Sequence, residues 1–350
     1  MKTADLTIDR MPGITWRWLR LNDRRVSFSA DGTAAEPVIS GPDGITVTDG
    51  AALPALDAGA GKDFEQFIAG ASSCGIDIPA GVKESAPVRL NFDFADGSHT
   101  LNRYGITVGG GSEATVIMDF RSGADAAGSA GIQTKIKLED GALLHFVQIH
   151  RAGDSFHIIN DLGAATGEKA RIEVIHVIFS GKEVDIGSEI ILHGDDSSAD
   201  MQVGYIARKD HQVDLSYLTP YIGKRGTSNL NVSGVLCDEA KKIFRGTIDF
   251  RKGCTDSVGD ENESVLLMDD HVVNQSVPTI LCDEENVEGN HGASIGKVDE
   301  ELMFYMMTRG ISYDEIYAMM AKAKLEAIFR QIPDRETVEE LLEYNETCNG

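Results

Sequence analysis

The sequence is poor in cysteine and contains no close pair of cysteines. The five cysteines are an odd number, and no two of them have the C-x-x-C spacing of zinc or redox sites. Structural disulfides are therefore not expected, and each thiol is predicted to be reduced. Cys254 and Cys282 are predicted to act as small apolar side chains, and the acidic residues that follow Cys282 argue against a reactive thiolate there.

Several sequence signals of chemistry and targeting are also missing. The chain has no G-x-x-x-x-G-K-[ST] P-loop and no G-x-S-x-G elbow, so we expect it to bind no nucleotide through a P-loop. The opening M-K-T-A-D-L-T-I-D-R lacks the apolar core of a signal peptide, and no later segment approaches the length of a membrane span. A cytoplasmic protein without membrane contact is expected.

Positive charge is scarce. The chain has 32 Lys and Arg against 56 Asp and Glu, which gives a formal net charge of −24. This charge would repel a phosphate backbone, and no basic cluster with interleaved aromatics offsets it, so nucleic acid is not an expected partner. The 350 residues, 42% of them hydrophobic, are enough for one large domain with an appendage or for two domains.

Short β-branched runs separated by Gly, Asp, Asn and Ser fill the chain from Val88 to about Val287. Only Pro220 and Pro278 interrupt this region, and nothing in it is long and periodic enough for a helix. A βαβ fold is therefore excluded, and the pattern leaves a sandwich, a barrel or a β-solenoid open. Before this region, residues 1 to about 80 are mixed, with a short helix predicted over Asp63–Ala69 and with Trp16 and Trp18 expected to anchor the segment on the main body.

Helix formers replace this pattern after Val298. Asp299 is a predicted N-cap, Gly310 a left-handed stop, and Ser312 with Glu315 a capping box that starts a second helix. Asp334 is the predicted N-cap of a third helix.

Five of the ten methionines fall in the first two of these helices. Methionine and aromatic side chains at helical spacing are either core or a flexible surface for a partner, and three helices are too few to bury all of them. We therefore predict a partner-binding face from the residues Leu302, Phe304, Tyr305, Met306 and Arg309.

His291 is the strongest single candidate for chemistry. It stands among Gly289, Gly292 and Gly296, and we interpret this stretch as a loop that leaves the imidazole open to a metal or a cluster. The alternative is a loop histidine that is hydrogen-bonded to the backbone. The other histidines are scattered without metal-ligand spacing, and no cofactor-binding residue is assigned.

The stretch from Gly289 to Ser312, G-N-H-G-A-S-I-G-K-V-D-E-E-L-M-F-Y-M-M-T-R-G-I-S, closely resembles the C-terminal signature of the SufB/SufD family of iron–sulfur cluster assembly proteins. The resemblance extends through Gly234–Leu267 and Ile78–Val88. It implies a mainly β protein: an N-terminal segment (1–80) packed on a right-handed parallel β-helix core (81–297), with a C-terminal helical domain (298–350). It also implies a non-enzymatic subunit.

The family resemblance further implies partners and a role for His291. An ABC-type ATPase, SufC, would dock on the C-terminal helices, and a SufB-type subunit or a second copy of the chain would form a dimer through Lys242–Phe250 and Ser264–Met268. His291 would contribute at that interface to a transient iron–sulfur cluster or to iron. Asn262 and Ala165 stand near the places of two SufB cysteines, so the chain is interpreted as SufD-like. The alternatives are a cytoplasmic β-helix carbohydrate-active enzyme and a purely structural binding module.

Overall fold

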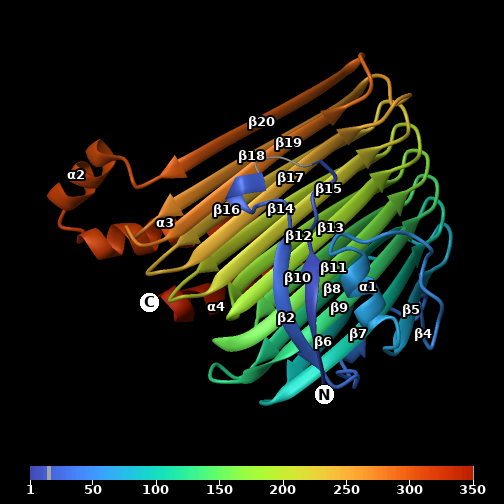
Figure 1. The fold of residues 1–350 in the computed structure, drawn as a ribbon, viewed down its shortest axis with the longest axis horizontal. Coiled ribbons are helices and arrows are strands. Elements are labelled where there is room, and N and C mark those ends of the chain that lie inside the picture. Colours follow the sequence, from blue (N-terminus) through green and yellow to red (C-terminus); the bar gives the residue numbers. More distant parts are fainter. Residues whose placement is uncertain (14–16, 350) are drawn as a thin grey trace.

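The computed structural model describes residues 1–13 and 17–349 of the chain. Two nine-stranded sheets face each other along its length (Figure 1), and from β5 onward successive strands alternate between them. Sheet I consists of β20 (Val287–Gly296), β18 (Ser257–Leu267), β16 (Thr227–Leu236), β14 (Ser198–Ala207), β12 (Arg171–Ser180), β10 (Leu143–Arg151), β8 (Glu113–Ser122), β6 (Val88–Phe94) and β3 (Val38–Ser40). Sheet II consists of β19 (Val273–Cys282), β17 (Lys241–Phe250), β15 (Gln212–Tyr221), β13 (Glu183–Leu192), β11 (Ser155–Thr166), β9 (Ala127–Leu138), β7 (Ser98–Val108), β5 (Ser73–Ile78) and β4 (Thr46–Asp49).

Neighbouring strands in both sheets are parallel, apart from the antiparallel pairs β3–β6 and β4–β5. The chain is therefore a parallel β-solenoid, as the resemblance implied, and the sandwich and the barrel are ruled out. Alternate residues of each strand point between the sheets, where equivalent positions stack from turn to turn. One such column consists of Val116, Phe146, Val174, Met201 and Leu230.

The N-terminal segment covers the outer face of sheet II. It contains the antiparallel pair β1 (Lys2–Ile8) and β2 (Arg24–Ala30), the short η1 (Arg17–Leu19) and α1 (Lys62–Ile68), which confirms the predicted short helix. Phe28 and Phe64 pack there against Leu101 and Ile159. The expectation of a tryptophan anchor is wrong for Trp18, whose side chain is 76% exposed, and Trp16 lies outside the described residues.

The C-terminal helices are α2 (Glu300–Thr308), α3 (Tyr313–Phe329) and α4 (Arg335–Asn349). The predicted caps are confirmed: Asp299 Oδ1 accepts the Leu302 N–H at 3.0 Å, and Ser312 and Glu315 form the capping box. α3 and α4 lie on the outer face of sheet I, where Leu325 and Phe329 join a cluster with strand residues such as Val177. α2 has no buried residue and projects from the body (Figure 1).

Two histidines are fully buried between the sheets. His176 Nδ1 lies 2.5 Å from the Tyr217 hydroxyl, whereas its Nε2 and the Nδ1 of His150 have no partner among the described residues. Burial lowers the pKa of both imidazoles to about 3. An unfolded histidine titrates near 6.5, so between about pH 6.5 and pH 3 the unfolded chain binds protons that the folded chain does not, and these groups cost stability as pH falls.

We expect His150→Phe to flatten this acid sensitivity. Each such histidine contributes up to about 1.4 kcal/mol of lost stability per pH unit below about 6.5, and phenylalanine has no proton to gain. Urea unfolding at pH 7 and pH 5 should therefore show a loss smaller by about 2 kcal/mol in the variant than in the wild type. The exposed His193→Phe serves as the control. Equal pH dependence in His150→Phe and wild type would contradict this account.

Candidate functional site at the open end of the solenoid

The solenoid ends in two strands whose outer edges are unpaired within the described chain. β20 is the last strand of sheet I and β19 the last strand of sheet II. In Figure 1 β20 forms the upper margin of the molecule. An unpaired strand edge presents a row of backbone donors and acceptors that can pair with another chain. We call the end formed by β19 and β20 the open end.

The dimerising segments predicted from the resemblance lie one strand inside this end. Lys242–Phe250 belongs to β17, which pairs with β15 on one side and β19 on the other. Ser264–Leu267 belongs to β18, which pairs with β16 and β20. Neither segment has a free strand edge among the described residues, so a sheet cannot be continued directly from them, and the outer edges at this end belong to β19 and β20. The prediction of a dimer through this region stays a prediction.

His291 lies in the middle of β20, so its interpretation as a loop residue is wrong. Gly289, Gly292 and Gly296 do not have positive φ angles, and they continue the extended strand. A β-carbon at Gly289 would lie 3.0 Å from Phe250 Cε2 and 3.2 Å from Ile280 Cδ1, which places Gly289 against the interior. His291, two residues further on, faces the same side and is exposed because no further turn covers it.

The register of β20 places His291 beside Glu261 of β18. Paired residues of parallel strands point to the same face, so Glu261 also faces the interior, where it is 4% exposed. Burial, with Glu263 as a second cause, raises the pKa of the Glu261 carboxyl to about 8. A β-carbon at Gly246 of β17 would overlap this carboxylate, so glycine there makes the room that Glu261 occupies.

A buried ion pair lies beside Glu261. Lys242 of β17 donates from Nζ to Glu263 Oε1, and both side chains are almost fully buried. Burial lowers the pKa of the Lys242 ammonium, while Glu263 opposes that change. The other carboxylate oxygen, Glu263 Oε2, and the hydroxyl of Tyr205 are buried without hydrogen-bond partners among the described residues. The interior near the open end is therefore polar, and only some of its buried polar groups have hydrogen-bond partners among the described residues.

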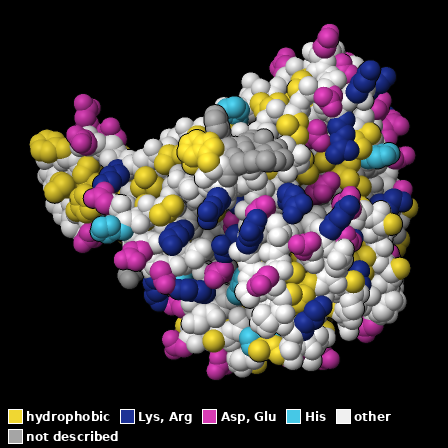
Figure 2. Space-filling model, in the orientation of Figure 1, with side chains coloured by type: hydrophobic (Ala, Val, Ile, Leu, Met, Phe, Trp, Pro, Cys, Tyr) yellow, Lys and Arg dark blue, Asp and Glu magenta, His cyan; other side chains and the backbone are white. Residues whose placement is uncertain are grey.

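The predicted partner-binding residues lie on the projecting helix α2. Leu302, Phe304 and Tyr305 are 39%, 71% and 55% exposed, and Arg309 follows the helix with its guanidinium 5.0 Å from the centre of the Tyr305 ring. Met306 is half-buried against the cluster under α3. Figure 2 shows hydrophobic side chains gathered on this projection. Sequence reasoning therefore located an exposed apolar surface, although Met306 contributes less to it than the others.

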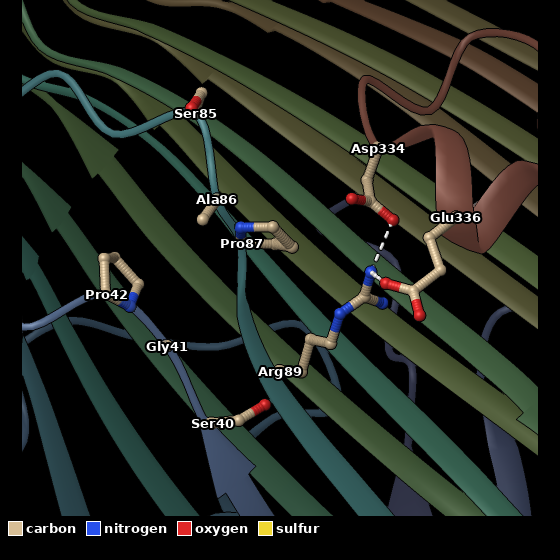
Figure 3. Close-up of a pocket in the computed structure, with 9 residues that line it drawn as sticks. All are labelled: Ser40, Gly41, Pro42, Ser85, Ala86, Pro87, Arg89, Asp334 and Glu336. Carbon is tan, nitrogen blue, oxygen red and sulfur yellow. Dashed lines mark hydrogen bonds and ion pairs between the residues drawn. The ribbon is translucent and has the colours of Figure 1, made fainter.

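A surface hollow of about 460 Å³ lies between the start of α4 and the strands β3 and β6. Figure 3 shows the Arg89 guanidinium directed at two carboxylates, Asp334 at 2.6 Å and Glu336 at 3.0 Å. Arg89 also donates to the Thr337 hydroxyl at 2.7 Å. The Arg89 guanidinium is therefore already neutralised and hydrogen-bonded. Its contacts attach the start of α4 to the solenoid.

One cluster with metal-ligand groups was missed by sequence reasoning. His157, Glu183 and Asp185 bring their donor atoms within 4.8 Å of one another on the outer face of sheet II. Arg24 of β2 already binds Glu183 at 2.6 Å and Asp185 at 3.1 Å, and His157 Nε2 lies 2.7 Å from Asp185. The group therefore fastens the N-terminal segment to the solenoid. Only the strand register reveals it, because the residues are up to 28 positions apart.

A parallel β-solenoid with an open polar end and a projecting helix that exposes apolar side chains defines the structural class of this chain. Within the described part of the chain, no helix has both the length and the apolar composition to cross a membrane.

Comparison with known proteins agrees with this class. The family model described as "SUF system FeS cluster assembly, SufBD core domain" matches residues 92–324, and the chain belongs to this family. It is 25% identical over 175 residues to the iron–sulfur cluster assembly protein SufD of Bacillus subtilis, a match that covers 50% of this chain and 40% of that protein. It is 24% identical over 206 residues to a SufBD family protein of Pyrococcus horikoshii, with 59% and 46% covered. A chloroplastic SufBD family protein of Arabidopsis thaliana is 22% identical over 189 residues, with 52% and 33% covered. The matches thus span less than half of each of these relatives.

Proposed function

We propose that this chain is a non-catalytic subunit of an iron–sulfur cluster assembly complex. In this proposal its open end pairs with a second SufBD-type chain, His291 provides an imidazole ligand for iron or a transient cluster at that junction, and α2 docks an ABC-type ATPase subunit. The observation that carries the proposal is the position of His291 on the last strand of a SufBD solenoid, a strand whose outer edge is unpaired in the described chain. The cytoplasmic location predicted from the sequence remains part of it.

The outer edges of β19 and β20 support the pairing step. Both strands are ten residues long, and a partner strand of similar length would satisfy a long row of backbone groups that now face water. The partner in this proposal is either a SufB-type subunit or a second copy of the chain.

Asn262, which stands near the position of a cysteine in SufB sequences, supports the proposal that this chain works next to a partner subunit that receives sulfur. Asn262 lies in β18 as an exposed residue, and its Oδ1 would be 3.0 Å from a β-carbon at Gly292 of β20. An amide cannot accept sulfur as a thiolate does, so the thiol chemistry belongs to the partner. No feature of the described residues favours a carbohydrate-active enzyme.

We expect Ser294→Lys to disrupt the pairing of this chain. Lysine on an edge strand opposes strand addition, and Ser294 is an exposed residue of β20. Sedimentation velocity at micromolar concentration, with and without a SufB-type subunit, should show a dimer for the wild type and a monomer for the variant. Ser40→Lys, on the edge strand β3 at the other end, is the matched control. A wild type that sediments as a monomer even with its partner would rule out the pairing step.

A further inference from the structure

We infer that Glu261 and Glu263 form the carboxylate part of a divalent-cation site whose imidazole ligand is His291, and that ferrous iron is the cation it takes. The inference rests on the proposed function, because it assigns further ligands to the iron that the proposal brings to His291. No two of these three residues are adjacent in sequence. The strand register brings them together at the open end.

The first argument is position. Glu261 and His291 are register partners on neighbouring parallel strands and face the same side. Adjacent strands lie about 4.8 Å apart, and metal–nitrogen and metal–oxygen bonds are each about 2 Å long. The donor atoms of Glu261, Glu263 and His291 do not all lie within 4.8 Å of one another in the structure, so a cation would bring them together through changes of rotamer. Glu263 stands two residues further along the same face of β18.

The second argument is the unsatisfied state of the carboxylates. Glu261 is 4% exposed, and no hydrogen bond or ion pair joins it to another described residue. Glu263 is equally buried, and only its Oε1 is bound, by Lys242, while its Oε2 has no partner in the described chain. Burying a carboxylate without partners costs several kcal/mol or forces it to take up a proton. A cation shared by the two groups would remove that cost.

The third argument is charge and space. Lys242 neutralises one of two buried carboxylates, so the ionised cluster carries one uncompensated negative charge in a low-dielectric interior. Gly246 provides the room in which the Glu261 carboxylate lies, since a β-carbon there would overlap it. The site is thus open on the side of β20, where His291 is exposed, and closed on the side of β17.

The donor set indicates the kind of ion. Carboxylate oxygens with one imidazole nitrogen suit first-row divalent metals, and ferrous iron is commonly held by imidazole and carboxylate together. No thiolate belongs to this set, so it is a site for a mononuclear cation and not for an intact cluster. It would hold iron beside the junction at which the proposed cluster forms.

The test is a titration of the full-length, metal-free protein with Co²⁺, followed by its visible absorption and by competition with Fe²⁺ under anaerobic conditions. Glu261→Gln keeps the shape of the side chain and removes its charge, and it should weaken Co²⁺ binding at least about tenfold. His291→Ala should weaken it similarly. Glu288→Gln, at an exposed position of β20 on the opposite face, should bind as the wild type does.

Thermal melting separates ligand loss from misfolding. Glu261→Gln replaces a buried carboxyl group that has no partner among the described residues with a neutral side chain of the same shape, so its melting temperature should equal or exceed that of the wild type. If this variant does not fold, Glu261→Asp replaces it and should also bind at least about tenfold more weakly, because the carboxylate is withdrawn by one methylene.

Equal Co²⁺ affinity in Glu261→Gln and wild type overturns the inference, as does a wild type that binds neither Co²⁺ nor Fe²⁺. A loss confined to His291→Ala also overturns it and leaves the proposed role of His291 standing. The proposed function itself is judged separately, from the iron content of the assembled complex.

Discussion

Replacing Phe304 with aspartate is expected to weaken binding of the ATPase subunit about thirtyfold or more. Phe304 is 71% exposed on α2, and truncating a central aromatic contact of an interface commonly costs about 2 kcal/mol or more. Because α2 has no buried residue, the substitution should leave the fold unchanged. Isothermal titration of the purified chain with the ATPase measures the effect directly.

Val38→Asp is the matched control for this experiment. Val38 is also 71% exposed, but it lies on β3, away from the C-terminal helices. The Val38→Asp variant should bind the ATPase as tightly as the wild type does. Undiminished binding by Phe304→Asp would show that α2 is not the docking surface.

Deletion of residues 299–350 would be a less specific test of ATPase docking than Phe304→Asp. α3 and α4 cover an apolar outer face of sheet I that includes Ile149, Val177 and Val235. Their removal would expose a contiguous hydrophobic surface, which promotes aggregation. Because α3 and α4 are packed on the solenoid, a loss of ATPase binding in the truncated chain could not be assigned to α2 alone.

The second large effect is expected for His291→Ala, which should remove most of the iron from the assembled complex. In the described structure His291 is the one side chain with a nitrogen donor on the inner face of β20, the strand at which the proposed partner meets this chain. His291 is exposed, so alanine should remove the imidazole and leave the fold unchanged. Docking of the ATPase should be unaffected, because α2 presents a separate surface.

Local sequence signals predicted the elements that depend on local chemistry. The caps at Asp299, Ser312 and Asp334 follow from side chains that bind backbone N–H groups two or three residues away, and all three are observed. Period-2 alternation identified the β core. The choice of a solenoid needed the family resemblance, because successive turns of sheet I differ in length, from 27 to 31 residues, and no strict repeat marks them.

The candidate site was only partly predictable, because its geometry depends on register. The glycines around His291 indicated a loop, whereas in the structure they continue a strand, and a β-carbon at Gly289 would fit tightly against Phe250 and Ile280. The pairing of Glu261 with His291 joins residues 30 positions apart, which no local pattern reveals. The position of the open edges was not predictable for the same reason, because only the strand order shows that β19 and β20 are the last strands.

The most direct test of the scaffold assignment is the iron and acid-labile sulfide content of the complex formed by this chain, a SufB-type subunit and the ATPase, reconstituted anaerobically. Wild type and His291→Ala should form the same complex, with iron and sulfide substantially lower in the variant. His271→Ala, an exposed histidine just before β19, should load as the wild type does. Equal iron and sulfide in wild type and His291→Ala would contradict the account and leave this chain as an architectural subunit only.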